Sequence, residues 1–466
     1  MLKSIKQILQ GILMIIKNGI IITWGTPNQI LTGFGILIQQ GTIQDIRPIA
    51  ELVRLFPEEP LFDAGGQLIM PGNICGHTHF YGAFARGMAT AGAPPKQFCE
   101  ILQKLWWGLD KSLTHEDVYY SAVVCLIDAI RHGTTCLFDH HASPSAIEGS
   151  LEQIAIAVEQ SGLRASLCYE VTDRDGEEKS EQGIRENVNY INYIKQSKPA
   201  QGRLHAMFGL HASFTVSQRT LEKCRSVVPD EVGFHFHLAE DLIDQFDSLD
   251  LYGERITERF YKAGILGKNS IAAHGVHIDP VEMELLAETS TWVTHQPRSN
   301  MNNAVGVAAV ESMARMGVRV CIGNDGFSNA MWEEWKTAYL LQKIYHRDPR
   351  RMNGNELINM AVYNNSKLAT HMFGKTIGRI EIGAAADLII VDYHPFTPLD
   401  ENNLAWHILF GFHESMITTT MVNGRFLMKN RELLTLDEEK ITSVARNRAP
   451  IIWQRYKNQF KKEVGN

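Results

Sequence analysis

Between residues 70 and 375 the sequence repeats one pattern, in which short apolar segments, most of them ending in histidine or a carboxylate, alternate with longer helical stretches. The short segments are "GNICGHTHF", "TTCLFDHH", "RASLCYEV", "MFGLHASF", "GFHFHLAE", "IAAHGVH", "TWVTHQP" and "VRVCIGNDG". Helical periodicity is clear at 116–133 and 149–162, and both stretches end at glycine, as helices often do. This alternation predicts a (β/α)8 barrel. The alternative is an open doubly wound sheet, but no glycine-rich nucleotide loop follows any of these segments.

Two β-rich ends enclose the barrel pattern. Residues 13–70 carry short runs of Ile, Gly and Thr, and similar runs return at 377–394 and 416–430, where Asn-Gly at 423–424 indicates a hairpin. The predicted fold class is therefore α/β, a distorted TIM barrel with a small β-sandwich domain formed by both termini. The expected parts are 1–69 as the first half of the sandwich, 70–375 as the barrel, and 376–466 as the second half with a terminal helix.

The charge of the chain disfavours two classes of partner, and its cysteines indicate a reducing compartment. The 466-residue chain has a net charge of −7 and no block of Lys or Arg, which disfavours nucleic acid and anionic membranes. Its seven cysteines form no CxxC pair, so we expect no disulfide framework and a cytoplasmic location.

The N-terminus does not look like a membrane segment. Lysines at 3, 6 and 17 interrupt its apolar run, and a small-residue cleavage site is missing. From Leu13 the sequence predicts strand around a Lys-Asn-Gly turn, and residues 1–12 are either a short amphipathic leader or an artefact of the start site.

Histidines and carboxylates gather where the predicted barrel strands end. They are His77, His79, His140, His141, His211, His235, His237, Glu240, His274, His277, His295 and Asp325. The carboxyl ends of barrel strands converge on one face, so these side chains are expected to share a site. His77 and His79 lie on the same strand face, roughly 6.5–7 Å apart, close enough to bind one ion. Neutral imidazoles with a carboxylate suit Zn²⁺ or Fe²⁺ better than Mg²⁺ or Ca²⁺.

Five segments together resemble the amidohydrolase superfamily: "PGNICGHTHF", "HFHLAED", "AAHGVHID", "QPRSNMNNAVG" and "GNDGF". The chain is most similar to the aminohydrolase/chlorohydrolase branch, which includes guanine, cytosine and adenosyl-homocysteine deaminases and triazine hydrolases. The resemblance runs from "MIIKNG" to "MVNGRF". The segments "QKLWWGLDKSLT" and "CYEVTDRDG" look most like a poorly characterised aminohydrolase subgroup associated with selenium and purine metabolism in bacteria.

This resemblance implies one divalent metal ion per chain, Zn²⁺ with Fe²⁺ as the alternative. The implied ligands are His77, His79, His237 and Asp325. It also implies Glu240 as proton shuttle, His274 as the residue that assists the attacking water, and Asp325 as base. It assigns no role to His235, and the missing lysine at the end of "MFGLHASF" implies a mononuclear site.

The resemblance says less about the substrate. His211 matches a residue that contacts the bound heterocycle, but Leu210 and His211 stand where guanine-specific members carry Arg-Phe. Asp110 lies near the position of a ribose-binding glutamate and Trp107 lies close by, although a surface or core role fits each equally well. The segment "SLCYEVTDRDG" lacks the third-strand arginine that the resemblance implies for a carboxylate-bearing homocysteine tail.

The predicted function is a metal-dependent hydrolytic deaminase that releases ammonia from an amino-substituted N-heterocycle such as a purine, pyrimidine or pterin. As a hydrolase it would act on carbon–nitrogen bonds of cyclic amidines. The open alternatives are a chlorohydrolase or a formimino or guanidino deiminase with the same metal site, and a non-catalytic scaffold. We expect a small-molecule heterocyclic substrate, no nucleic-acid or membrane partner, and a homodimer.

Overall fold

All the predicted barrel strands form, and they run parallel. The computed structural model describes residues 13–197 and 199–463. The strands are β8 (Asn73–Thr78), β9 (Thr134–His141), β10 (Arg164–Tyr169), β11 (Leu204–Ala206) with β12 (Phe208–Gly209), β13 (Phe234–Leu238), β14 (Ile271–His274), β15 (Trp292–His295) and β16 (Arg319–Ile322). Nearly every residue in them is buried, because barrel strands are covered on both faces.

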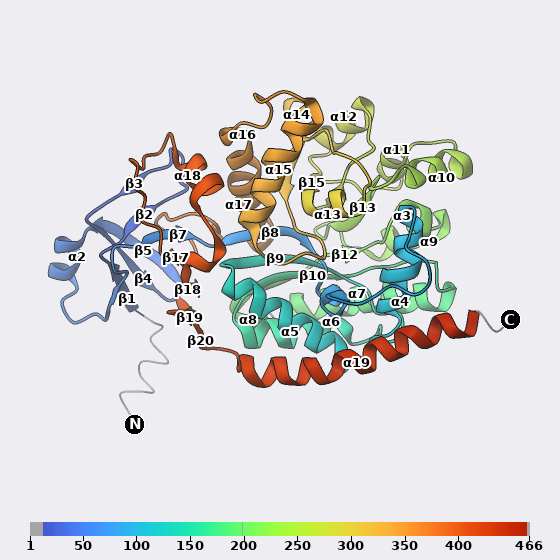
Figure 1. The fold of residues 1–466 in the computed structure, drawn as a ribbon, viewed down its shortest axis with the longest axis horizontal. Coiled ribbons are helices and arrows are strands. Elements are labelled where there is room, and N and C mark those ends of the chain that lie inside the picture. Colours follow the sequence, from blue (N-terminus) through green and yellow to red (C-terminus); the bar gives the residue numbers. More distant parts are fainter. Residues whose placement is uncertain (1–12, 198, 464–466) are drawn as a thin grey trace.

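The strands pair as two sheets, β11-β10-β9-β8 and β12-β13-β14-β15-β16. Single parallel bridges, Thr78 with Asp325 and Val171 with Leu210, join the sheets at their two seams. This arrangement agrees with the predicted distorted barrel (Figure 1). The first seam lies where the predicted ligands of β8 meet Asp325.

Helices cover the outside of the barrel. The stretches predicted at 116–133 and 149–162 form α5 (His115–Arg131) and α6 (Ser150–Ser161). A capping box between Thr114 and Asp117 begins α5, and Gly162 ends α6 in the left-handed conformation. The others are α7 (Glu177–Ser197), α9 (Gln218–Val227), α10 (Leu242–Tyr252), α11 (Ile256–Lys262), α12 (Pro280–Glu288), α13 (Pro297–Asn302), α14 (Val310–Arg315), α15 (Met331–His346), α16 (Gly354–Ile358) and α17 (Asn365–Phe373).

Strands from both ends of the chain form a second, two-layered β structure beside the barrel (Figure 1). One sheet has the order β5-β4-β1-β6 and the other β20-β19-β18-β17-β7-β2-β3. Their bounds are β1 (Leu13–Lys17), β2 (Ile20–Ile22), β3 (Ile30–Leu31), β4 (Phe34–Gln39), β5 (Thr42–Pro48), β6 (Leu61–Asp63), β7 (Leu68–Pro71), β17 (Leu388–Val391), β18 (Ile417–Val422), β19 (Arg425–Lys429) and β20 (Glu432–Leu433). A core that includes Ile16, Ile36, Ile69 and Leu388 fills the space between the sheets.

The sequence signals for this β structure are confirmed at two turns. Asn18, in the Lys-Asn-Gly turn, has φ 55°, and the Asn423–Gly424 pair joins β18 to β19 with φ of 46° and 69°. Both central residues of such a two-residue hairpin must be left-handed, which Asn and Gly tolerate. The exact domain limits stay predictions. The predicted leader at 1–12 lies outside the described residues, and every described helix is too short or too polar for a bilayer span.

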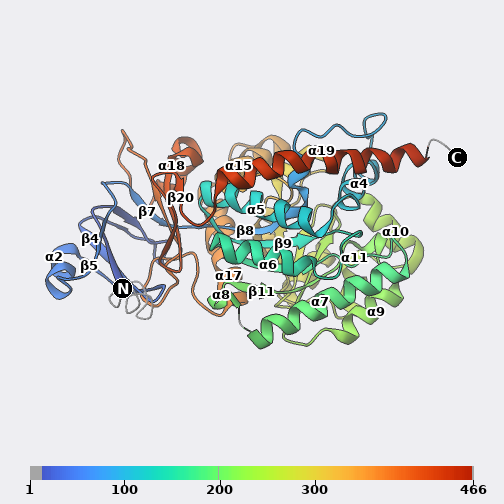
Figure 2. The same ribbon diagram turned by 90° about the horizontal axis from the view of Figure 1, so that it is seen from below.

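The C-terminal helix α19 (Glu438–Glu463) lies along the barrel and not beside the β structure (Figures 1 and 2). Trp453 donates from Nε1 to the Phe84 carbonyl at 2.9 Å, and the Tyr456 hydroxyl donates to the Lys104 carbonyl. These bonds hold the segment after β8, which continues through η1 (Phe80–Ala85), α3 (Phe98–Ile101), η2 (Leu102–Trp106) and α4 (Trp107–Asp110).

A buried ion pair ties the base of the barrel to the β structure. Arg164 begins β10, and its guanidinium lies 3.0 Å from the Asp387 carboxylate, with the two side chains 2% and 1% exposed. Arg164 also donates to Asn423 Oδ1 at 2.9 Å, and the Asn423 amide donates to Asp387 at 2.8 Å. The pair therefore connects the barrel to the β18–β19 hairpin.

We expect Asp387→Asn to lower the free energy of unfolding by about 3–5 kcal/mol, because it leaves the Arg164 charge buried without a counter-ion. Urea unfolding of the wild type and the variant measures this difference. The control is Asp348→Asn, which breaks an exposed pair with Arg350. Equal stability of the Asp387→Asn variant and the wild type would contradict the importance of this contact.

Candidate metal and active site

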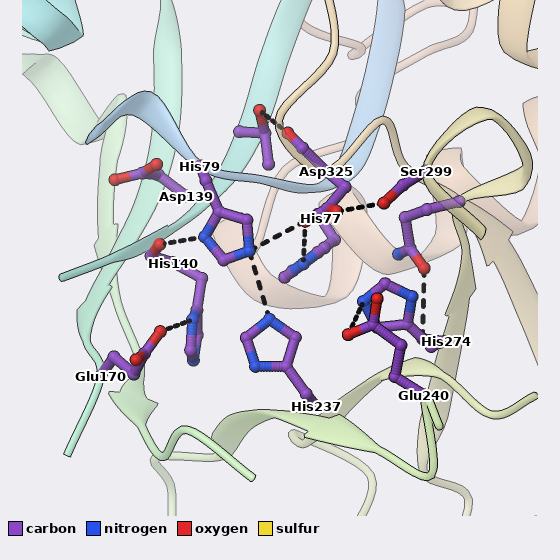
Figure 3. Close-up of polar contacts among 12 residues, drawn as sticks. His77, His79, Asp139, His140, Glu170, His237, Glu240, His274, Ser299 and Asp325 are labelled. Atoms are coloured by element: carbon purple, nitrogen blue, oxygen red, sulfur yellow. Dashed lines mark hydrogen bonds and ion pairs between the residues drawn. The ribbon is translucent and has the colours of Figure 1, made fainter. Parts of the chain in front are cut away.

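The structure brings all four predicted metal ligands together at the carboxyl ends of the strands (Figure 3). His79 Nε2 lies 2.9 Å from Asp325 Oδ1 and 3.2 Å from His237 Nε2. His77 Nε2 lies 3.4 Å from the same carboxylate oxygen. His274 joins them, because its ligand atom and those of His77, His237 and Asp325 all lie within 4.8 Å of one another.

Three of these rings have an oxygen acceptor beside Nδ1. The pairs are His79 with the His140 carbonyl (2.5 Å), His237 with the His211 carbonyl (3.0 Å) and His274 with Asn300 Oδ1 (2.9 Å). A carbonyl oxygen only accepts, so each ring donates from Nδ1 and leaves Nε2 to face the cluster. Histidines that bind metal ions are oriented by outer partners in this way.

His77 has a different outer partner. Its Nδ1 lies 2.8 Å from Nε2 of His235, which places His235 behind the ligand and not in the cluster. Within the described chain, Nε2 of His77 and Nε2 of His274 are buried without any hydrogen-bond partner. Buried imidazole nitrogens without partners around one carboxylate fit a divalent ion that prefers nitrogen and oxygen ligands. The donor set therefore fits a metal centre.

The backbone is strained where these residues leave their strands. His274 and Asp325 have φ of 77° and 56°, in the left-handed region that side chains other than glycine rarely adopt. Gly323 lies so close to β8 that a Cβ there would come 2.7 Å from the backbone N and O of His77. This contact lets the Asp325 amide donate to the His77 carbonyl at 3.1 Å. The ligands of the first and last barrel strands are thereby held in register.

Glu240 lies next to this cluster. Its Oε2 is 3.5 Å from His274 Nε2, and Asn303 donates from Nδ2 to its Oε1 at 3.3 Å. Burial and the nearby charge of Asp325 together raise the pKa of Glu240 to about 7, against the opposing effect of His274. A carboxyl group with a pKa near neutrality can both give and take a proton.

A cavity opens over the cluster and is lined by two of the three predicted substrate-binding residues, His211 and Trp107. Their ring centroids lie 6.3 Å apart. Trp106 also lines the cavity, so neither tryptophan is only a core residue. Burial lowers the pKa of His211 to about 4.

Asp110, the third predicted substrate-binding residue, does not line the cavity. It is 1% exposed and forms an ion pair with Arg174, whose guanidinium lies 5.1 Å from the ring centroid of Trp107. Burial raises the pKa of Asp110 to about 7, although Arg174 opposes that shift. The geometry places Asp110 behind the wall that Trp107 forms.

Other candidate histidines lie outside the ligand cluster. His141 Nε2 pairs with Ser143 Oγ at 2.9 Å, and His277 Nε2 lies 2.6 Å from the Val305 carbonyl. His295 is buried at the end of β15. The sequence made these three histidines candidates only because they lie at strand ends. A histidine in that position can also form hydrogen bonds with the surrounding loops.

Several residues of the site were not singled out from the sequence. They are Glu170, Ser299, Asn300 and Asn303. Ser299 donates to Asp325 Oδ2, and it stands with Asn300 and Asn303 in "QPRSNMNNAVG", a segment that resembles the superfamily. Glu170 follows β10 directly, so its position after a barrel strand was a usable signal.

Known proteins resemble this chain in sequence and in fold. The model of the amidohydrolase family matches residues 68–427. The chain belongs to this family. It is 32% identical to a 5'-deoxyadenosine deaminase of Methanobrevibacter smithii over 394 residues, covering 83% of this chain and 87% of the relative. It is 30% identical to a 5-methylthioadenosine/S-adenosylhomocysteine deaminase of Acetivibrio thermocellus over 435 residues, covering 92% and 96%.

A solved structure supports the fold. The adenosine deaminase of Xanthomonas campestris with bound zinc superimposes with a TM-score of 0.81 at 21% identity, covering 96% of this chain and 98% of that one. The predicted superfamily, the TIM-barrel fold and the class of hydrolytic deaminases acting on C–N bonds are confirmed by these relatives. The selenium-associated subgroup, the homodimer and the cytoplasmic location stay predictions.

We expect His77→Asn to lose bound metal and activity together while the barrel still folds, because asparagine is a poor ligand and the core layers lie below the strand ends. Elemental analysis and the melting temperature of the same sample measure both. The control is His205→Asn, a β11 histidine bonded to Ser166 and outside every ligand cluster. A folded His77→Asn protein with full metal content would contradict the assignment.

Gly323→Ala tests the seam between β8 and β16. The added methyl group meets the His77 backbone, so we expect a loss of about 1–3 kcal/mol in unfolding free energy and weaker metal retention. Chelator titration and urea unfolding measure the two effects. Gly267→Ala is the control, since a Cβ there meets nothing within 4 Å. Unchanged metal retention in Gly323→Ala would show that the seam does not position the ligands.

Proposed function

We propose that this protein is a hydrolytic deaminase that releases ammonia from an amino-substituted N-heterocycle, with one Zn²⁺ per chain held by His77, His79, His237 and Asp325. The observation that carries the proposal is the Glu240 carboxyl group, with its raised pKa, 3.5 Å from His274 at the edge of the ligand cluster. A proton carrier beside a metal centre is what hydrolytic deamination of a ring requires.

The ion would supply one effect, since a divalent metal lowers the pKa of a water molecule toward neutrality. The chain's own groups move the protons. Asp325 or Glu240 accepts the proton of the attacking water as its oxygen bonds to the ring carbon that bears the amino group. Glu240 delivers a proton to the adjacent ring nitrogen. The remaining proton of the added hydroxyl group passes through Asp325 or Glu240 to the amino group, the carbon–nitrogen bond breaks, ammonia leaves, and the hydroxyl oxygen becomes the ring carbonyl.

The names of the relatives support a purine ring as the heterocycle. Both relatives are named as deaminases of adenosine derivatives, and they match the chain across more than four-fifths of its length. Trp107 and His211 at the cavity wall provide flat surfaces beside such a ring.

We expect Glu240→Gln to reduce kcat by about 10²–10⁴-fold with metal content preserved, because glutamine keeps the shape but cannot carry the proton. Ammonia release from purines, pterins, pyrimidines and formimino compounds is the assay, and chloride release from a chlorinated triazine is measured in parallel. Loss of metal in Glu240→Gln would make this residue a ligand. Release of chloride without release of ammonia from any compound would replace the deaminase with a chlorohydrolase.

A further inference from the structure

Glu170 is a buried carboxylate that the proposed chemistry does not use. It follows β10, is 3% exposed, and lines the cavity. Its Oε1 lies 3.8 Å from His211 Nε2, and its Oε2 lies 3.5 Å from His140 Nδ1 (Figure 3). Oε2 has no hydrogen-bond partner among the residues that the structure describes. A buried carboxylate in this state is costly unless a donor reaches it.

The imidazoles beside Glu170 do not form a hydrogen bond with Oε2, and the nearest ring nitrogen, His140 Nδ1, lies 3.5 Å away. His140 Nε2 lies 3.0 and 3.1 Å from the carbonyl oxygens of Leu210 and His235, so the proton of the neutral ring is on Nε2. The Nδ1 atom that faces Glu170 is then an acceptor as well. With a neutral His140 ring, two acceptors face each other across 3.5 Å.

His211 repeats this arrangement on the cavity side. Its Nδ1 lies 2.5 Å from Thr215 Oγ1, and that hydroxyl donates to the Ala212 carbonyl at 3.1 Å. The single hydroxyl proton is used there, so His211 donates from Nδ1 and presents Nε2 as an acceptor. Glu170 and His211 together form an acceptor pair in the cavity wall.

The acceptor pair lies beside the reacting centre. Ligand atoms of Glu170, His211 and His237 all lie within 4.8 Å of one another. His237 is also one of the residues around Asp325. A substrate atom that meets Glu170 therefore belongs to the ring under attack or to a group attached directly to it.

The charge of the cavity wall points to the same class of substrate. The lining contains five carboxylates, Glu170, Glu240, Asp241, Asp244 and Asp325, and no lysine or arginine in the described part of the chain. Arg174 is the nearby cation, but it pairs with Asp110 behind Trp107. A carboxylate or phosphate on the substrate would meet charges of its own sign.

We propose that Glu170 is a specificity-determining residue that accepts a hydrogen bond from a ring N–H or a second amino group of the substrate. The cavity then selects a neutral or cationic amino-heterocycle without an anionic tail. This inference rests on the proposed deaminase function and deepens it by naming the substrate class. Glu170 touches the substrate and takes no part in the proton transfers of Glu240.

The test measures binding on metal-loaded Glu240→Gln protein by calorimetry, with and without Glu170→Gln. The probes are 5'-deoxyadenosine, its 2-amino derivative, free adenine, and S-adenosylhomocysteine. Relative to 5'-deoxyadenosine, the 2-amino derivative adds an amino group and free adenine adds a ring N–H. S-adenosylhomocysteine adds a carboxylate-bearing tail. A hydrogen bond to a charged acceptor predicts that at least one donor-bearing ring binds about 10- to 100-fold more tightly than 5'-deoxyadenosine.

Glu170→Gln is expected to reduce this preference to about twofold or less, and S-adenosylhomocysteine is expected to bind more weakly than 5'-deoxyadenosine. Glu177→Gln is the control, because it removes an equal charge from the exposed start of α7. Glu170→Asp keeps the charge but shortens the side chain, and it should lower the same preference if the glutamine variant fails to fold.

An unchanged preference in Glu170→Gln, or an equal loss of affinity for every probe, would overturn the inference. So would two metal ions per wild-type chain with one lost in Glu170→Gln, because Glu170 would then be a ligand. Tight binding of S-adenosylhomocysteine would overturn the exclusion of anionic tails. Ammonia release by the wild type is measured separately, so failure of deamination counts against the proposed function alone.

Discussion

Asp325 is a carboxylate, 13% exposed, that is surrounded by imidazole rings, and the arrangement of the site depends on compensating its charge. Burial alone would raise its pKa, but His79 and His77 outweigh burial and hold the pKa well below the ordinary value. Three of the surrounding rings have outer acceptors at Nδ1, so their Nε2 atoms face the cluster. A carboxylate in such a site is costly unless positive charge compensates it, either from a protonated ring or from a bound divalent ion. The same constraint explains the outer partners, since each fixes one ring nitrogen as a donor.

The backbone of the barrel is strained next to the residues that surround Asp325. Asp325 and His274 leave their strands with positive φ, and Gly323 presses against the backbone of His77. Such conformations persist only where the surrounding structure over-determines them. Here the buried strands and the backbone hydrogen bond from Asp325 to His77 hold these conformations in place. The strain lies at the ligands, as expected where function and not stability sets the geometry.

Most of the fold, and the gathering of the proposed metal ligands, could be predicted because both follow from periodic patterns. Parallel barrel strands are uniformly apolar, and their carboxyl ends converge, so His77 and His237 could be placed near Asp325 without coordinates. The contacts that the residues of the cavity wall make could not be predicted in this way. Asp110 resembles a ribose-binding residue in sequence, but in the structure Arg174 pairs with it. That pairing joins two different βα loops, and no local pattern encodes a contact of that kind.

The cavity wall also depends on residues far away in the chain. Trp106 and Trp107 belong to a segment whose carbonyl groups are held by α19, through Trp453 and Tyr456. Tyr456 is fully buried, and its hydroxyl also accepts from the Ala91 amide at 2.9 Å. A loop without strands of its own would otherwise be free to move at the cavity. The wall beside His211 and Glu170 is therefore positioned by the last helix of the described chain, while the metal ligands are positioned by the barrel itself. The tryptophan side of the cavity and the residues that follow the barrel strands are consequently held by different parts of the structure, so substitutions in α19 and in the barrel seam act on different sides of one site.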